Sequence, residues 1–318
     1  KNKIMIDFIK LNITDGLRFE EHLTKFQITE LKTFLNSSTG VIELYPKYGK
    51  YLNLDIKVNP KHSKISGSLH KLENICFLGE NQNFNDFTYN ELKSQIPMLE
   101  EIFDLNQNNS LSYLEIGFNL KLDLDPQKII DEKIIMYDFK NHQKDLKFNG
   151  NGDFKEFIKR DYSIKIYSKS KQYKKQFNLD EHLLRVEIKI KTKRKIQNFG
   201  IYCLSDLLDK NKIFNVVAFL YKEFEKLTII DSLNFDNLPE KDREKLNRYT
   251  NPNYWQRLRT ENKSYKVQNR LKNDFNLILN EYNLNSLKED LKYKLAHKFW
   301  VLINQNEKEL FEPISKEG

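Results

Sequence analysis

A tyrosine, two carboxylates and several lysines in this chain have the chemistry needed to act on a phosphodiester. Glu115, Tyr167 and Glu187 each lie in a short stretch in which apolar and polar residues alternate. Carboxylate oxygens are the hard ligands that Mg²⁺ or Mn²⁺ prefers, and such an ion can orient a phosphate and neutralise developing charge. A tyrosine hydroxyl, with an unperturbed pKa of about 10, becomes a useful nucleophile beside a cation or a metal-bound phosphate. Tyr167 is therefore a candidate nucleophile, and the two glutamates are candidate metal ligands.

Lysines surround the candidate nucleophile in the sequence. Lys165, Lys169 and Lys171 lie two residues before and two and four residues after Tyr167, so on a strand they would share its face. They belong to the stretch 155–195, which holds fourteen Lys and Arg residues against five Asp and Glu, in a chain of net charge +8. Clustered basic residues beside aromatic ones indicate a nucleic-acid partner, although a solvated basic face is the alternative. We expect Lys169 to assist Tyr167 in catalysis. We expect Lys165, Lys171, Lys174 and Lys175 to contact DNA.

The stretches that carry these residues read as strands. Residues 111–122, 162–169 and 183–191 alternate with period two, which predicts one packed and one presented face on each. As neighbours in one antiparallel sheet, they would present Glu115, Tyr167 and Glu187 on a common face, and Gly117 would leave room there for a substrate backbone. The pattern leaves a structural alternative open, because strand tyrosines commonly pack and a glutamate between basic residues commonly forms an ion pair.

A histidine is a third candidate metal ligand. Ser66, Ser68 and His70 fall on one side of a predicted strand at 64–72. Ser68-Leu69-His70 resembles half of a His-hydrophobic-His metal motif whose first histidine is replaced. A simple hydrogen-bonded histidine is the alternative.

The remaining pattern predicts an α+β protein with a helical C-terminal part. Thr88 and Glu91 form a candidate capping box at the start of an amphipathic helix. After residue 200, helices are expected at 204–229, 238–249, 251–260, 263–282 and 285–304. We therefore predict an α+β nicking and joining domain at 1–212 and a helical DNA-binding or accessory domain at 213–318. No stretch approaches eighteen apolar residues, so no membrane partner is expected.

The helical part also contains a basic and aromatic segment, 251–273. Arg257 and Arg259 lie in it beside Trp255. Such a mixture suits DNA backbone contact and base stacking, whereas helix packing is the alternative for the aromatic residues.

Five segments, in order, resemble the gene II/X-type replication initiators of filamentous phages and related plasmids. The segments are IMIDFIKLNI, SLHKLENICFLGENQNFNDF, SYLEIGFNL, IKIYSKSKQY and LLRVEIKIKTK. Lys71 matches the lysine of a Ser-x-x-Lys motif, Tyr167 and Lys169 match the catalytic tyrosine with its following lysine, and Arg185 and Glu187 match a Leu-x-Arg-x-Glu strand. The chain departs from the family pattern at Glu80, where filamentous-phage members carry His, and at Glu115, where many carry Asp.

The resemblance implies a metal-dependent tyrosine endonuclease of the HUH/Rep-like type, with a central antiparallel sheet flanked by helices. Tyr167 would nick one strand of origin DNA, single-stranded or supercoiled duplex, keep a 5′-phosphotyrosine link and later rejoin the strand. A host helicase and polymerase would act with it in the bacterial cytoplasm. Two alternatives remain: a relaxase or transposase with the same tyrosine chemistry, and a non-enzymatic DNA-binding initiator or repressor. Tyr162 and Tyr173, close by in the sequence, are the alternative nucleophiles.

Overall fold

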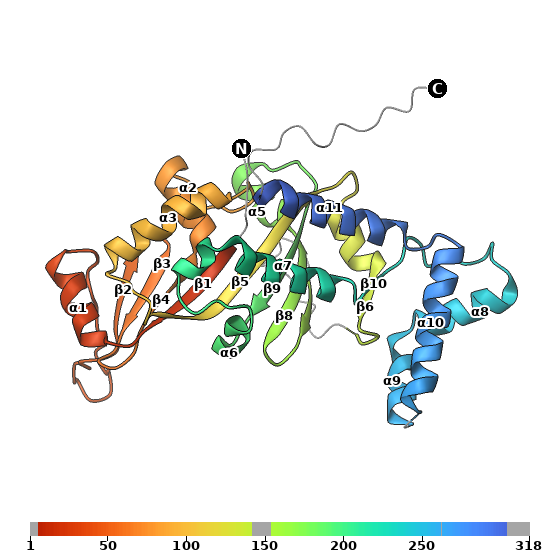
Figure 1. The fold of residues 1–318 in the computed structure, drawn as a ribbon, viewed down its shortest axis with the longest axis horizontal. Coiled ribbons are helices and arrows are strands. Elements are labelled where there is room, and N and C mark those ends of the chain that lie inside the picture. Colours follow the sequence, from red (N-terminus) through yellow and green to blue (C-terminus); the bar gives the residue numbers. More distant parts are fainter. Residues whose placement is uncertain (1–5, 142–153, 262, 304–318) are drawn as a thin grey trace. The chain divides into compact units, whose positions relative to one another are not determined.

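The computed structural model describes residues 6–141, 154–261 and 263–303 (Figure 1). The strands are β1 (Ile6–Ile13), β2 (Lys47–Tyr51), β3 (Leu54–Val58), β4 (Ser63–Ser68), β5 (Ser110–Lys121), β6 (Ile134–Tyr137), β7 (Phe154–Ile158), β8 (Tyr162–Ser168), β9 (Leu183–Ile190) and β10 (Leu227–Ile229). The α-helices are α1 (Gly16–Lys25), α2 (Leu69–Leu78), α3 (Tyr89–Ile102), α4 (Pro126–Lys128), α5 (Lys169–Phe177), α6 (Lys193–Gln197), α7 (Lys210–Phe224), α8 (Glu240–Tyr249), α9 (Pro252–Thr260), α10 (Tyr265–Glu281) and α11 (Ser286–Ile303). A π-helical turn, η1 (Ile129–Lys133), and a 3₁₀ turn, η2 (Ser205–Leu208), complete the elements.

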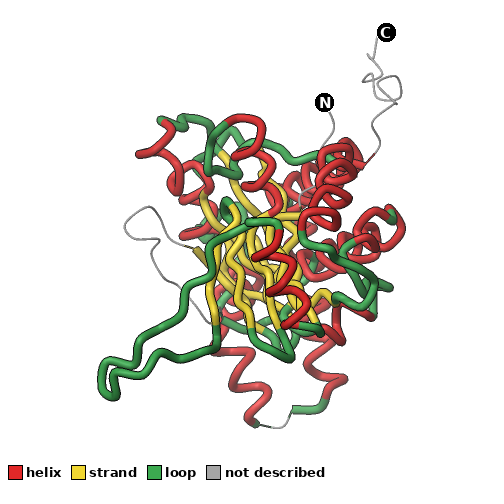
Figure 2. The backbone as a smooth tube through the Cα atoms, turned by 90° about the vertical axis from the view of Figure 1, so that its left-hand side faces the viewer, coloured by secondary structure: helices red, strands yellow, loops and turns green. Residues whose placement is uncertain are grey.

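Eight strands form one antiparallel sheet, and helices flank it (Figure 2). Their order is β2-β3-β4-β1-β5-β9-β8-β7, and β6 and β10 form a separate two-stranded sheet. The α+β class is therefore confirmed. The three strands predicted to carry the candidate site are neighbours, with β9 between β5 and β8. Adjacency of these strands is what allows residues far apart in the sequence to meet on one face.

The chain divides into two compact units that both include parts of β5 and β9. The first comprises Lys1–Gly117, Lys189–Val217 and His297–Gly318. In it, α2 packs on β1 and α3, and the buried leucines Leu69, Leu72, Leu92 and Leu99 belong to these helices. The second unit comprises Phe118–Ile188 and Ala218–Ala296. The functional division into 1–212 and 213–318 stays a prediction.

The N-terminus of α3 forms as the sequence predicts. Thr88 Oγ1 accepts a hydrogen bond from the Glu91 backbone N–H at 2.8 Å, and Glu91 Oε2 accepts one from the Thr88 backbone N–H at 2.5 Å. This reciprocal capping box satisfies two backbone donors that the helix leaves unpaired.

Two predicted strands end earlier than expected, each at a serine. Ser68 Oγ accepts a hydrogen bond from the backbone of Lys71 at 3.1 Å and caps α2, while Ser168 Oγ accepts one from the backbone of Lys171 at 3.2 Å and caps α5. A serine in extended conformation followed by a helix is a preferred N-cap arrangement. His70, Lys169 and Lys171 therefore lie on helices, and their prediction as strand residues is wrong.

The helix predicted at 204–229 is interrupted at both ends. Residues 205–208 form η2, and Leu227–Ile229 form β10, which pairs with β6. Asp206 Oδ2 accepts hydrogen bonds from the backbone of Tyr202 and Cys203, which orders the segment before α7. The other four predicted helices correspond to α8–α11. Within the described residues, no helix combines the length and apolar character needed to cross a membrane.

Candidate active site

A β-bulge in β1 prepares the first part of the site. Ile6 pairs with Ile116 and Ile9 with Leu114, so Asp7 and Phe8 together oppose the single residue Glu115. In a regular strand, residues three apart such as Ile6 and Ile9 would lie on opposite faces, yet both are buried apolar partners of β5 core residues. The bulge therefore sets both Asp7 and Phe8 opposite Glu115, and bulges are common next to functional sites.

Neighbouring polar groups hold the Asp7 carboxylate. Its Oδ1 accepts a hydrogen bond from Ser68 Oγ at 2.6 Å, and both of its oxygens lie 2.9 Å from Asn83 Nδ2. Asp7 is 5% exposed. These contacts fix the orientation of a buried acid that sequence reasoning did not propose. The available signal was a single charged residue inside the apolar run Ile4 to Ile9.

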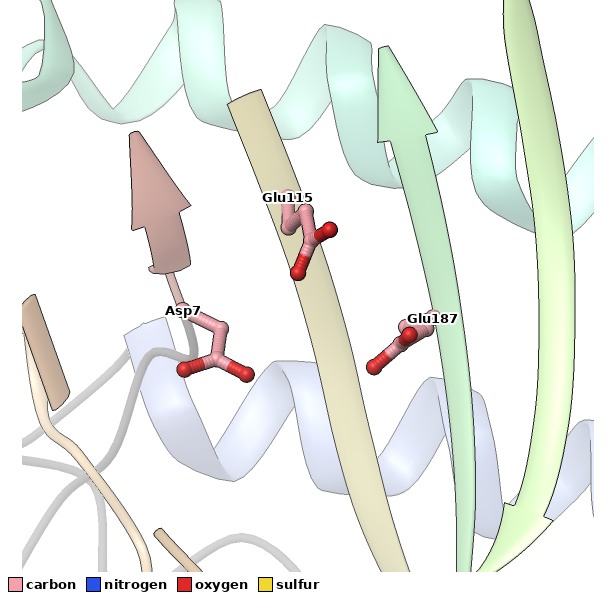
Figure 3. A group of neighbouring side chains, drawn as sticks. All are labelled: Asp7, Glu115 and Glu187. Carbon is pink, nitrogen blue, oxygen red and sulfur yellow. The ribbon is translucent and has the colours of Figure 1, made fainter. Parts of the chain in front are cut away.

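Asp7, Glu115 and Glu187 form an acidic triad (Figure 3). One carboxylate oxygen from each of the three lies within 4.8 Å of the other two. Glu115 comes from β5 and Glu187 from β9, as the sequence predicts, whereas Asp7 takes the place expected for a histidine. Asp7 and Glu187 are buried and Glu115 is half-buried, and grouping such acids costs free energy unless protons, cations or a metal compensate their charge.

The donor set fits a hard divalent cation. All three ligands are carboxylate oxygens, which Mg²⁺ and Mn²⁺ favour. Opposite ligands of Mg²⁺ are separated by roughly 4.2 Å, twice a bond of about 2.1 Å, so the triad has close to the required spacing. The hydrogen bonds that Ser68 and Asn83 donate to Asp7 are of the outer-shell kind that orients metal-binding carboxylates. The buried triad could therefore hold a metal ion.

Cations also lie beside the acids. Lys189 Nζ lies 3.4 Å from Glu115 Oε1, and the Tyr113 hydroxyl donates a hydrogen bond to the same oxygen. Arg185 Nε lies 2.9 Å from Glu187 Oε2. Glu115 and Glu187 therefore also form the ion pairs that the sequence left open as an alternative. These cations offset part of the charge that a metal would otherwise have to compensate.

Tyr167 lies between a lysine and one acid of the triad. Its hydroxyl donates a hydrogen bond to Glu187 Oε2 at 3.2 Å and accepts one from Lys169 Nζ at 3.2 Å. Lys169 comes from the first turn of α5, so the change from strand to helix after Ser168 is what returns its ammonium to the tyrosine. The ammonium stabilises negative charge on the phenolic oxygen, and the carboxylate can accept the phenolic proton.

Arg185 orients Glu187 from the other side. Its Nε donates to Glu187 Oε2 at 2.9 Å and its Nη1 donates to Asn119 Oδ1 at 3.1 Å. Arg185 is 0% exposed and Asn119 2%. This burial does not fit the predicted DNA contact of Arg185, whose guanidinium is engaged with Glu187 and Asn119.

The face that carries Tyr167 is buried, so the prediction of a presented face on β8 and β9 is wrong. Tyr167 is 5% exposed, Lys169 1% and Glu187 2%. The long side chains cover one another: Lys165 Nζ lies 4.2 Å from the ring centre of Phe154 and 4.8 Å from that of Tyr167. Cation–π contacts keep these ammonium groups over aromatic rings, where alternation alone would place them in solvent. The surroundings of the Tyr167 hydroxyl are polar and charged.

His70, the predicted histidine ligand, contacts other residues and is not part of the acidic triad. It lies in the first turn of α2, is buried, and its Nε2 is 2.7 Å from Asn85 Oδ1. Its ring stacks on Phe87 with centroids 5.5 Å apart. The group of side chains that could hold a metal ion among the described residues contains Asp7 and does not contain His70.

The predicted DNA-contacting residues differ in exposure and fall into three groups, exposed, half-buried and buried. Lys174, Lys175 and Arg257 are exposed, and Lys71, Lys171 and Arg259 are half-buried. The guanidinium of Arg259 donates to the backbone oxygen of Phe139 at 3.1 Å. Lys165 is buried with Tyr167 and is not placed to meet a phosphate from solvent.

The two alternative nucleophiles are less suitably placed. Tyr162 donates a hydrogen bond to Glu223 Oε2 at 3.0 Å, and burial together with the Glu223 charge raises the pKa of Tyr162 to about 12. A higher pKa reduces the fraction of the reactive phenolate. Tyr173 is buried, with its ring in edge contact with Phe177 and 5.1 Å from Lys169 Nζ.

Comparison with known proteins gives a structural likeness and no sequence match. No family model and no curated protein matches the sequence. The chain is structurally similar to a rolling circle replication initiator protein from Geobacillus stearothermophilus, with 10% identity and a TM-score of 0.38. The similarity covers 76% of this chain and 91% of the other. At this identity and TM-score, it does not extend to the roles of residues.

Proposed function

We propose that this protein is a rolling-circle replication initiator that nicks and rejoins a DNA strand through Tyr167. The observation that carries the proposal is the placement of the Tyr167 hydroxyl, 3.2 Å from Lys169 Nζ and 3.2 Å from Glu187, an acid of the triad. The motif resemblance of residues 3–215 supports the same chemistry independently. Nucleophile, cation and acid meet although they come from different elements.

In the nicking step, the Tyr167 oxygen attacks a backbone phosphorus and its proton passes to Glu187. A bond forms between the phenolic oxygen and phosphorus, while the bond from phosphorus to the 3′ oxygen breaks. The 3′ oxygen takes up a proton and leaves as a 3′-hydroxyl, and the 5′-phosphate stays on Tyr167. Because the phosphotyrosine retains the energy of the broken bond, a 3′-hydroxyl can attack it later and rejoin the strand.

The other residues of the site support this step, and Glu187 has a second role as a candidate metal ligand. Lys169 stabilises the phenolate, and Arg185 holds Glu187 toward Tyr167. Asp7, Glu115 and Glu187 would hold Mg²⁺ or Mn²⁺, which when bound would neutralise charge on the phosphate. Lys174 and Lys175 of α5 are exposed, and they would contact the DNA backbone. Origin DNA is thus the proposed partner, with a host helicase and polymerase using the 3′ end.

A non-enzymatic DNA-binding initiator or repressor is the second candidate function. One observation favours it: Tyr167 is only 5% exposed and is fully engaged by buried side chains. In that case Tyr167, Glu187 and Arg185 would form a structural polar network within the sheet. A relaxase or transposase would use the same tyrosine chemistry on a different DNA.

Covalent adduct formation separates these functions. Labelled single-stranded 60-mers that tile the DNA around the coding sequence are incubated with the full-length protein and Mn²⁺, then resolved on a denaturing gel. We expect the wild type to form an adduct with one or a few oligonucleotides, and Tyr167→Phe to form none. Tyr202→Phe, at an exposed tyrosine, is the matched control and should form the wild-type amount. An equal adduct in Tyr167→Phe would refute the assignment, and no adduct in the wild type would favour the non-enzymatic alternative.

A further inference from the structure

A three-helix cluster in the second unit, formed by α8, α9 and α10, has its own core (Figure 1). Leu246 and Tyr249 of α8, Trp255 of α9, and Phe275 and Ile278 of α10 are buried together. Trp255 Nε1 donates a hydrogen bond to the Tyr249 backbone oxygen at 2.7 Å. A buried aromatic core with satisfied polar groups gives such a cluster a defined arrangement.

One face of α10 is anchored to this core by charge as well as by apolar contact. Asp274 accepts hydrogen bonds from the Tyr249 hydroxyl at 2.8 Å and from Lys245 Nζ at 3.0 Å. Tyr282, which ends α10, donates from its hydroxyl to Asp242 of α8 at 2.9 Å. These two anchors are eight residues, or roughly 2.2 turns, apart along the helix, so they fix its rotation about its axis.

The outward face of α10 carries a stripe of residues suited to duplex DNA. Lys266, Arg270, Asn273 and Leu277 are exposed and follow one another at spacings of four, three and four, so they lie on one side of the helix. On a helical wheel this side is opposite Phe275. Asn269 borders the stripe. Among the residues that the structure describes, neither Lys266 nor Arg270 belongs to an ion pair.

The charge and the side-chain types of the stripe favour duplex DNA as its binding partner. The segment 251–273 holds six Lys and Arg residues and one acidic residue, so its field is positive. Arginine pairs with guanine and asparagine with adenine by paired hydrogen bonds in the major groove, and an apolar side chain can contact a thymine methyl group. An α-helix about 10–12 Å across fits that groove, which is about 12 Å wide. Binding to an anionic membrane would require several apolar residues on this face of α10, and Leu277 is the one apolar residue of the stripe.

We infer that α10 is a major-groove recognition helix that reads the sequence of duplex DNA through Asn269, Arg270 and Asn273. Lys266 and Lys263 of the preceding turn contact phosphates and set the register. This inference deepens the proposed function and rests on it, since it gives the initiator a way to find its origin in duplex form before a single strand is cut. It also shifts the predicted duplex contacts from Arg259, which binds the backbone of Phe139, to α10.

Selection and binding with defined probes test the inference. Full-length protein is used to enrich a 30-base-pair duplex library with a randomised centre, and the enriched duplex and a scrambled one are then compared by fluorescence anisotropy across NaCl concentrations. We expect the wild type to enrich a motif. Lys266→Ala/Arg270→Ala should weaken binding to both duplexes at least tenfold and reduce the salt slope by about 1 to 2. The matched control, Lys61→Ala/Lys64→Ala, removes two exposed lysines elsewhere and should stay within twofold.

The amide variants separate sequence reading from charge. Asn273→Ala and Asn269→Ala should leave affinity for the scrambled duplex unchanged and lower the preference for the enriched duplex by roughly 5- to 150-fold, corresponding to about 1–3 kcal/mol. Thermal unfolding of each variant should match the wild type. An unchanged motif and affinity in Lys266→Ala/Arg270→Ala would overturn the inference, as would wild-type protein that enriches no duplex but binds vesicles of anionic lipid or polyglutamate.

Failure of this inference is distinguishable from failure of the proposed function. All α10 variants should retain the Tyr167-dependent adduct on single-stranded oligonucleotides, and Tyr167→Phe should retain duplex selection. If the protein selects a duplex but forms no adduct, the nuclease function is refuted and the inference about α10 is retained. If the α10 variants keep both the adduct and wild-type duplex binding, only the inference about α10 is refuted.

Discussion

The Tyr167 hydroxyl donates a hydrogen bond to Glu187 Oε2 at 3.2 Å, and that same oxygen accepts one from Arg185. The tyrosine is thus joined to the acidic triad through one carboxylate oxygen. Any change in the position of Glu187 alters both the acceptor for the phenolic proton and the candidate metal site.

Removing Lys169 should slow the chemical step. Lys169→Met deletes the ammonium 3.2 Å from the phenolic oxygen while keeping a side chain of similar length. Since one charge-assisted hydrogen bond contributes about 1.5–3 kcal/mol, we expect the single-turnover rate of adduct formation to fall roughly 10- to 150-fold. Lys171→Met, in the same helix turn, is the control and should change DNA affinity more than rate. A wild-type rate in Lys169→Met would exclude a role for the ammonium.

Metal affinity should depend on Asp7 and on the serine that holds it. Asp7→Asn removes one charged ligand, and Ser68→Ala removes the 2.6 Å hydrogen bond to that ligand. We expect Mn²⁺ affinity, measured by titration calorimetry, to fall more than tenfold in Asp7→Asn and roughly tenfold in Ser68→Ala. Ser66→Ala, two residues earlier on β4, is the control. Equal affinity in Asp7→Asn and wild type would show that the triad is not the metal site.

Arg185 should be essential for stability while Glu187 is present. Arg185→Leu leaves a buried carboxylate without the 2.9 Å cation, so we expect the free energy of unfolding in urea to fall by about 3–5 kcal/mol. The double variant Arg185→Leu/Glu187→Leu removes both charges and should recover most of the loss. If the double variant is as unstable as the single one, packing of the arginine outweighs its charge pairing.

The salt dependence of DNA binding should report contacts from α5. Lys174 and Lys175 are exposed in the last turn of the helix that carries Lys169. Lys174→Ala/Lys175→Ala should lower affinity for a single-stranded 60-mer and reduce the slope of log K against log[NaCl] by about 1 to 2, because each lost phosphate contact releases fewer counterions. Lys61→Ala/Lys64→Ala again serves as the charge-matched comparison. An unchanged slope would place the DNA elsewhere.

Glu73 of α2 should make stability depend on pH near neutrality. Burial, aided by the Glu91 charge, raises the pKa of Glu73 to about 7. A raised acid pKa means that the folded state binds the proton more tightly, so Glu73 costs nothing well below its unfolded-state pKa of about 4.3 and lowers stability increasingly up to pH 7. Glu73→Gln should therefore raise the free energy of unfolding by about 1 kcal/mol at pH 8, after allowance for solvent screening, and change little at pH 4. If Glu73→Gln changes the free energy of unfolding equally at pH 4 and pH 8, the raised pKa of the Glu73 carboxyl is contradicted.

Local signals predicted the elements, and the site depended on contacts between distant segments. The α3 capping box, the alternation of β5, β8 and β9, and the order of α8–α11 follow from residues close in sequence. The N-caps at Ser68 and Ser168 are equally local, but strand alternation continues through them and concealed the change to helix. Sequence alone could not show that both faces of β8 are covered, because a run that alternates lysine with isoleucine has the same pattern whether the lysines meet water or aromatic rings.

Asp7 could not be assigned from sequence because its position depends on the pairing register of β1 with β5. In a regular strand, Ile6 and Phe8 would share one face and Asp7 would point to the other, with no preferred neighbour on β5. Only the pairing of Ile6 with Ile116 and of Ile9 with Leu114 reveals that Asp7 and Phe8 oppose Glu115.

The irregular pairing in β1 has a consequence for how this acidic pocket can arise or be lost. Removing Phe8 would make the pairing with β5 regular and leave Asp7 alone opposite Glu115, but it would also move Asp7 into the position opposite Ser68. The aspartate would keep its face of the sheet and lose its present alignment with Ser68 and Asn83, although every side chain remained chemically intact. Insertions and deletions in the first strand should therefore be tolerated less well than conservative replacements, a pattern that a deletion scan across Ile6 to Ile9 would reveal.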